Sequence, residues 1–182
     1  MPLSEEEKHQ LWSLAKQAVE SAVRDQPKPK PHSHKGVLGE TRGCFVTVKN
    51  NGRLRGCIGT FQAQAPLAET VVEMGRQSTN DPRFVLDPIT PDELDEITIE
   101  VSVLSPLQET ENPEELTVGE HGIYIISPYG SGCFLPEVAT ELNWSAEEFL
   151  TNCCTHKAGL PPDAWKRDDT RVFLFTSEKF EK

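Results

Sequence analysis

A thiol beside a guanidinium group is the feature of this sequence that points most directly to chemistry. Arg55, Gly56 and Cys57 follow one another in a segment with the composition of a β-strand. A nearby cation favours the thiolate, which is the form of cysteine that acts as a nucleophile or in redox reactions. Cys57 is therefore the candidate catalytic residue, with Arg55 and Gly56 as candidate ligand-binding residues. The alternative is a buried structural cysteine whose neighbouring glycine relieves crowding.

A nucleophilic cysteine needs a base, which is usually a histidine held by a third group. His121, directly before the apolar segment 122–126, is the histidine that we consider for this role. A Cys57–His121 dyad is the resulting hypothesis. The alternative is that His121 is a turn residue.

Two charged residues could bind a ligand near Cys57. Arg83 could hold an anion with its planar fork of donors, or it could tie the turn at Asp81 to the sheet. Glu100 lies on the polar face of a predicted strand. Because a buried, unpaired carboxylate is costly, we expect Glu100 to pair with an arginine, either Arg55 or Arg83.

The sequence contains no pattern typical of a metal site, and we predict no metal or other cofactor. The five cysteines have no regular spacing and include no Cys-x-x-Cys pair. His32 and His34 lie in a proline-rich segment without an accompanying carboxylate or thiol, so a solvated loop is favoured there. An odd number of cysteines indicates reduced thiols and a cytoplasmic protein.

The elements that must position these residues begin with a predicted β-hairpin over residues 45–48 and 54–58. A three-residue loop pairs Val48 with Leu54 and keeps one face of the hairpin apolar. A two-residue loop would place Val48 opposite Arg55 and spoil that face, so we expect the three-residue loop.

This register has a consequence for the candidate site. It places Arg55 and Cys57 on the same face of the hairpin, about 6–7 Å apart at their Cα atoms, because side chains on a strand alternate. Thr47 and Phe45 lie across from them on the partner strand. Cys44 points instead into the apolar layer.

The other elements are indicated by capping patterns and by the periodicity of apolar residues. Helices are predicted over 4–24, 66–78, 136–142 and from 145 to a stop at 159, and strands over 97–104, 122–126, 133–135 and 171–176. Strands in adjacent hairpins with helices between others predict an α+β fold with a largely antiparallel sheet flanked by helices. A chain of 182 residues fits one domain, 1–182, with a small lobe as a possibility.

Composition excludes two classes of function. The net charge of −11 repels nucleic-acid phosphates, and we find no basic segment that would offset it. No apolar run approaches the roughly 20 residues that cross a bilayer. We therefore expect a soluble protein that binds neither nucleic acid nor membrane.

Residues 54–59, with the sequence Leu-Arg-Gly-Cys-Ile-Gly, resemble the signature of the AMMECR family, which is called AmmeMemoRadiSam system protein A in prokaryotes. The resemblance extends along nearly the whole chain, through residues 43–47, 81–84, 99–104, 134–138 and 157–161. Cys44 and Cys133 depart from the family pattern, where Ala and Thr are usual, so these two thiols look dispensable.

The resemblance implies a larger sheet-containing part and a smaller lobe separated by a cleft, but it supplies no reaction. It also implies association with a Memo-like protein and a radical-SAM protein. One interpretation is a component of a modification system in which the Cys57 thiolate acts on a small molecule in the cleft. The other is a non-catalytic adaptor that presents the same surface to a Memo-like or radical-SAM partner.

Overall fold

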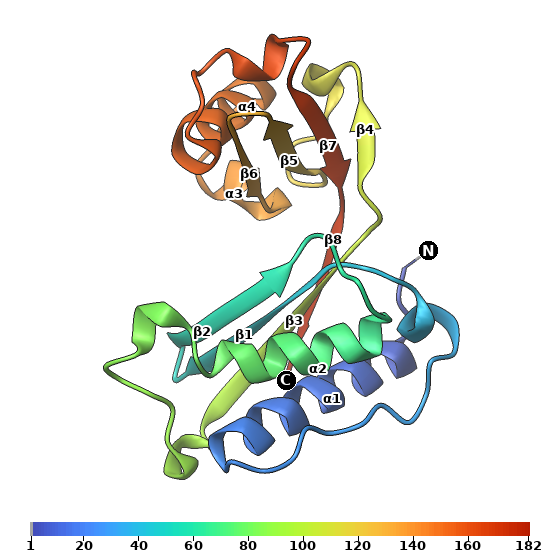
Figure 1. Ribbon diagram of the computed structural model, residues 1–182, viewed down its shortest axis with the longest axis vertical. Helices are drawn as coiled ribbons and strands as arrows, with labels where there is room; N and C mark the ends of the chain where they lie inside the picture. The colour runs from blue at the N-terminus through green and yellow to red at the C-terminus, as the bar shows by residue number, and fades with distance from the viewer. Residues whose placement is uncertain (1) are drawn as a thin grey trace. The chain divides into compact units, whose positions relative to one another are not determined.

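The computed structural model describes residues 2–182, which divide into two compact units (Figure 1). The first unit consists of the chain up to Leu104 together with Glu178–Lys182, and the second is Ser105–Ser177. No helix within residues 2–182 is both long and apolar enough to cross a membrane.

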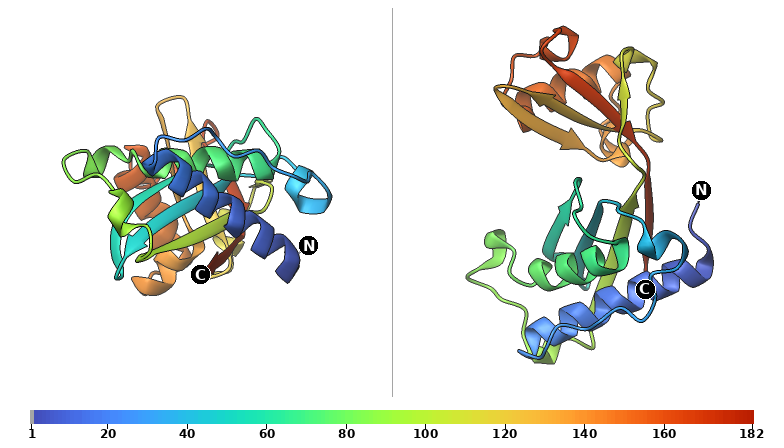
Figure 2. Two further views of the ribbon diagram at one scale, coloured as in Figure 1. Left: turned by 90° about the horizontal axis from the view of Figure 1, so that it is seen from below. Right: turned by 45° about the vertical axis from the view of Figure 1, so that its right-hand side comes forward.

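A sheet with helices on one face forms the first unit. Its elements are α1 (Glu5–Val23), a 3₁₀ turn at Gly36–Gly39, β1 (Cys44–Asn50), β2 (Arg53–Thr60), α2 (Leu67–Ser78), 3₁₀ turns at Pro82–Phe84 and Pro91–Glu93, β3 (Ile97–Leu104) and the C-terminal strand β8 (Ser177–Glu181). Within the described chain the sheet has the order β2-β1-β3-β8, so β2 is an edge strand. Figure 2 shows α1 and α2 on the same side of this sheet.

Apolar alternation explains which face of the sheet the helices cover. Val46 and Val48 of β1 and Val101 of β3 are fully buried in one cluster with the apolar residues of α1 and α2. Side chains on a strand alternate, so the intervening residues of β1 and β3 lie on the face turned away from the helices. We call this second face the open face of the first sheet.

The predicted helices of the first unit are confirmed, and their ends have local causes. Ser4 and Glu7 form a capping box at the start of α1. Pro66 precedes α2, where a missing N–H costs nothing because the first helical N–H groups have no partner in the helix.

The predicted hairpin forms, but its predicted register is wrong. The turn has two residues, Asn51 and Gly52, and Val48 pairs with Gly56 instead of Leu54. A shift between Val48 and Lys49 adds one residue to β2. Because of this bulge, the apolar face of β1 continues and Val48 does not lie opposite Arg55. A two-residue turn with regular pairing would have placed these two residues opposite each other.

The second unit contains its own antiparallel sheet. Its elements are β4 (Gln108–Thr110), a 3₁₀ turn at Pro113–Glu115, β5 (Gly122–Ser127), β6 (Gly130–Phe134), α3 (Pro136–Glu141), α4 (Ala146–Cys153), a π turn at Cys154–Ala158, a 3₁₀ turn at Ala164–Lys166 and β7 (Arg171–Phe175). The strand order in the described chain is β4-β7-β5-β6. Phe149 and Leu150 of α4 are fully buried with Ile123 and Ile125 of β5.

The α+β fold class is therefore confirmed, with two antiparallel sheets in the described chain. Strands β4 and β8 were not predicted, because Gln108–Thr110 and Ser177–Glu181 are polar and carry no clear alternation. Each lies at the end of its sheet, where half-exposed polar residues are tolerated. The cleft implied by the family resemblance stays a prediction.

Candidate functional site

Cys57 is half-buried on β2 and lies directly opposite Thr47 of β1. The hydroxyl of Thr47 donates a hydrogen bond to the Cys57 sulfur, with 3.1 Å between Oγ1 and Sγ. This contact fixes the position of the sulfur beside β1. This pairing differs from the predicted register, which placed Thr47 opposite Arg55 and Phe45 opposite Cys57.

The open face carries a polar row that crosses three strands. Thr47 pairs with Cys57 on one side and with Glu100 of β3 on the other. Adjacent strands are roughly 4.8 Å apart, so the Cys57 and Glu100 backbones lie about 10 Å from each other. The row therefore brings a thiol and a carboxylate onto the same face of the sheet.

Glu100 is buried and pairs with lysines, so the prediction of an arginine partner is wrong. Its carboxylate lies 2.9 Å from Nζ of Lys49 and 3.4 Å from Nζ of Lys179. Lys49 lies two residues beyond Thr47 on the same face of β1, which puts its long side chain within diagonal reach. The hydrogen bond to Glu100 is the main cause of the raised pKa of Lys49.

The backbone of Cys57 is held by the loop that follows α2. Asp81 accepts a hydrogen bond from the Cys57 N–H at 2.9 Å, and Arg83 donates one to the Cys57 carbonyl at 3.3 Å. Hydrogen bonds from Arg83, and also from the backbone of Cys57, hold the pKa of Asp81 far below its usual range. The contacts of Arg83 are those expected of a residue that ties the Asp81 turn to the sheet.

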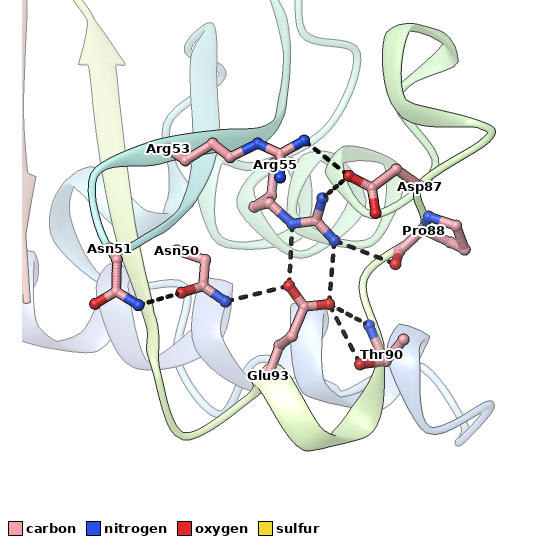
Figure 3. A network of polar contacts seen from close by, with 8 residues as sticks. All are labelled: Asn50, Asn51, Arg53, Arg55, Asp87, Pro88, Thr90 and Glu93. Atoms are coloured by element: carbon pink, nitrogen blue, oxygen red, sulfur yellow. Dashed lines mark hydrogen bonds and ion pairs between the residues drawn. The ribbon is translucent and has the colours of Figure 1, made fainter.

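Arg55 does not share a face with Cys57, and that part of the hairpin prediction is wrong. Its guanidinium group binds Glu93, Asp87 and the carbonyl of Pro88, as Figure 3 shows. Asn50 also binds Glu93, and by alternation Asn50 lies on the helix-covered face. Arg55 is the extra residue of the bulge, which turns its side chain away from the thiol.

The contacts of Arg55 are structural. Its Nε, Nη1 and Nη2 atoms all donate within this network, and the side chain is only 4% exposed. A role in binding a ligand stays a prediction, which would require these donors to exchange partners.

Gly56 is required by close packing. A Cβ atom at this position would lie 1.9 Å from the carbonyl oxygen of Ser78, at the end of α2. Real Cβ atoms do not approach backbone oxygens so closely, so only glycine lets α2 end against β2. Its predicted role in ligand binding is not tested by this contact.

His121 belongs to the second unit, whereas Cys57 belongs to the first. Nδ1 of His121 accepts a hydrogen bond from the Thr117 N–H at 2.9 Å, which closes a turn before β5. This is the alternative role considered for His121, and the Cys57–His121 dyad stays a prediction.

The other cysteines have environments that suppress reactivity. Burial raises the pKa of Cys44 to about 12. Burial also raises the pKa values of Cys133, Cys153 and Cys154. All five cysteines are free thiols. Cys57 and Cys133 are the half-buried ones, while the other three are buried.

Sequence reasoning did not assign roles to Lys49, Asp87 and Glu93. Glu93 completes the capping box that begins at Thr90. A capping glutamate has a second oxygen that can bind a cation, but nothing in the local pattern identifies Arg55 as its partner.

The fold and the site together define an α+β protein with two antiparallel sheets and a cysteine on an edge strand of the first. The sequence profile of the AMMECR1 family matches residues 12–180, and the chain belongs to this family. A protein of Methanothermobacter thermautotrophicus is 40% identical, over 100% of this chain and 97% of the relative. Protein TK0174 of Thermococcus kodakarensis is 41% identical, over 94% of this chain and 88% of its own length.

A solved structure supports the same conclusion. The crystal structure of the uncharacterized protein PH0010 from Pyrococcus horikoshii matches with a TM-score of 0.79 and 38% identity. The match covers 94% of this chain and 89% of that one. The predicted AMMECR resemblance is therefore confirmed.

Proposed function

We propose that this protein is a component of an AmmeMemoRadiSam-type modification system and that the Cys57 thiolate acts on a small molecule bound at the open face of the first sheet. The observation that carries the proposal is the hydrogen bond from the Thr47 hydroxyl to the Cys57 sulfur. A half-buried sulfur that accepts a hydrogen bond is accessible and has a defined position.

The surroundings of the thiol support the same proposal. Asp81 and Arg83 fix the backbone of Cys57 on the side away from β1, so the sulfur has a defined position. Glu100, with its two lysine partners, offers both charges on the same face. A ligand with both an electrophilic carbon and a charged group would match this arrangement.

The family resemblance supplies the context of the proposal. A Memo-like protein and a radical-SAM protein are the proposed partners, and the radical chemistry would belong to the latter. Free thiols are suited to a reducing compartment, so we place the protein in the cytoplasm as part of this proposal.

The test is the rate of iodoacetamide alkylation of Cys57 in the folded protein, followed by mass spectrometry. Thr47→Val keeps the shape of the side chain but removes the donor, so we expect alkylation of Cys57 to slow several-fold. The folded protein is then incubated with a small-molecule cell extract, and we expect an adduct on the Cys57 peptide. Cys57→Ser should abolish the adduct, whereas Cys133→Ser is the matched control that should retain it.

The proposal fails if Thr47→Val leaves the alkylation rate unchanged and no adduct forms at Cys57. The remaining interpretation would then be a non-catalytic adaptor protein. That interpretation predicts that Cys57→Ser preserves binding to a Memo-like or radical-SAM partner.

A further inference from the structure

Two large aliphatic side chains lie exposed at the tip of the segment between α2 and β3. Val85 is 74% exposed and Leu86 is 97% exposed, and the preceding Phe84 is half-buried. Single exposed apolar residues are common on protein surfaces, but an adjacent pair forms a small patch that water solvates poorly. We call Val85 and Leu86 the apolar tip.

The apolar tip is fixed at both ends. On its N-terminal side, Asp81 is buried and binds Arg83 and the backbone of Cys57. On its C-terminal side, Asp87 binds Arg55 at 2.7 Å, and the next carbonyl, of Pro88, accepts from Arg55 at 3.2 Å (Figure 3). A preorganised loop loses little conformational entropy when it binds, which favours a docking role over a mobile linker.

Two arginines flank the apolar tip, and each has a more exposed side chain than the aspartate that it binds. The side chains of Arg53 and Arg83 are 70% and 58% exposed. The Asp81 side chain is 2% exposed, although that of Asp87 is 52% exposed. The surface around the tip therefore presents guanidinium groups on a chain whose net charge is −11.

We propose that the apolar tip docks into an apolar pocket of a different protein, and that carboxylates on the rim of that pocket meet Arg53 and Arg83. An aliphatic anchor that fills a pocket contributes to the affinity of such contacts, while a charged rim sets orientation and association rate. A second copy of this chain is a poorer occupant. In a two-fold contact the same patch meets itself, so the arginines would face arginines.

Site-specific photo-crosslinking in cells tests this proposal. The full chain carries the photoreactive residue p-benzoylphenylalanine at position 86, and crosslinked proteins are identified by mass spectrometry. Leu142 is the matched control position, since it is 53% exposed and belongs to the second unit. We expect a crosslinked protein at position 86 that is absent at position 142.

The captured protein is then purified and its affinity measured with variants of the full chain. We expect Leu86→Asp to weaken binding at least tenfold and Arg53→Glu to weaken it several-fold, with affinity falling as salt increases. Leu142→Asp and Cys57→Ser should bind like the unmodified chain, which separates this proposal from the thiol chemistry. Thermal unfolding of each variant checks that the fold is retained.

Three results would overturn the proposal. The first is crosslinking at position 86 no stronger than at position 142. The second is unchanged affinity of Leu86→Asp for the captured protein. The third is a crosslinked product that consists of two copies of this chain, together with a dimer in solution that Leu86→Asp dissociates.

Discussion

Asp81 accepts a hydrogen bond from the backbone N–H of Cys57, with 2.9 Å between the two atoms. The edge strand β2 would otherwise leave this N–H without a partner, because it points away from β1. Arg83 satisfies the carbonyl of the same residue. The loop after α2 thus supplies the hydrogen-bond partners of the Cys57 backbone at the sheet edge. Cys57 is also the residue whose side chain we propose to be reactive.

Replacing Asp81 should destabilise the first unit. Asp81→Ala leaves the Cys57 N–H unpaired and removes the partner of Arg83, so we expect a loss of about 2–3 kcal/mol in the free energy of unfolding. Urea denaturation measures this loss. Asp95→Ala is the control, since Asp95 is exposed and should change stability by less than about 0.5 kcal/mol. Equal effects of the two substitutions would contradict the assigned role of Asp81.

Glu93 should make stability depend on pH in the acidic range. The Thr90 backbone hydrogen bond, followed by those from Arg55 and Asn50, lowers the pKa of Glu93 from 4.5 to about 2. A depressed pKa in the folded state means that the charged form stabilises the fold above the unfolded-state pKa. This contribution, about 1–2 kcal/mol after solvent screening, is lost as the pH falls from 4.5 to about 2.

The measurement is the difference in unfolding free energy between the unmodified chain and Glu93→Gln. We expect the difference to be largest near neutral pH and to shrink steadily through the acidic window. A difference that stays constant with pH would mean that the charge of Glu93 does not contribute.

Gly56→Ala should be far more damaging than Gly75→Ala. At position 56 the added methyl group meets the backbone oxygen of Ser78 at 1.9 Å, so a strand or a helix end must move. At position 75 the nearest atom is the side chain of Ala18 at 3.0 Å, and the gain in helix propensity of about 1 kcal/mol offsets part of the crowding. We expect Gly56→Ala to cost more than about 3 kcal/mol in thermal or urea unfolding. Similar stabilities for the two variants would refute the close approach of α2 to β2.

The thiols should be alkylated in a defined order. Cys57 is half-buried, whereas Cys44 and Cys153 are buried with raised pKa values. We expect iodoacetamide to modify Cys57 at least tenfold faster than these two in the folded protein, because both access and thiolate formation limit the reaction. The same experiment in denaturant is the control and should give similar rates for all thiols. Early modification of Cys44 would show that the first sheet opens more readily than its packing implies.

Local patterns predicted most of the elements but not the pairing of the candidate site. Ser4 with Glu7, and Ser145 with Glu148, predicted helix starts that the structure confirms, because capping depends on residues within one turn. The hairpin was predicted for a similar reason. Its register was not, because the bulge at Arg55 is stabilised by Asp87 and Glu93, more than thirty positions further along the chain.

The sequence by itself determined the family and the α+β class, since these depend on composition and short patterns. Only the tertiary structure decided that Thr47 and Glu100 form a row with the thiol and that Arg55 points away from it. It also decided that lysines, and not arginines, neutralise Glu100. Salt bridges and cross-strand pairs join residues distant in sequence, so their partners are fixed by which strands lie side by side and in which register.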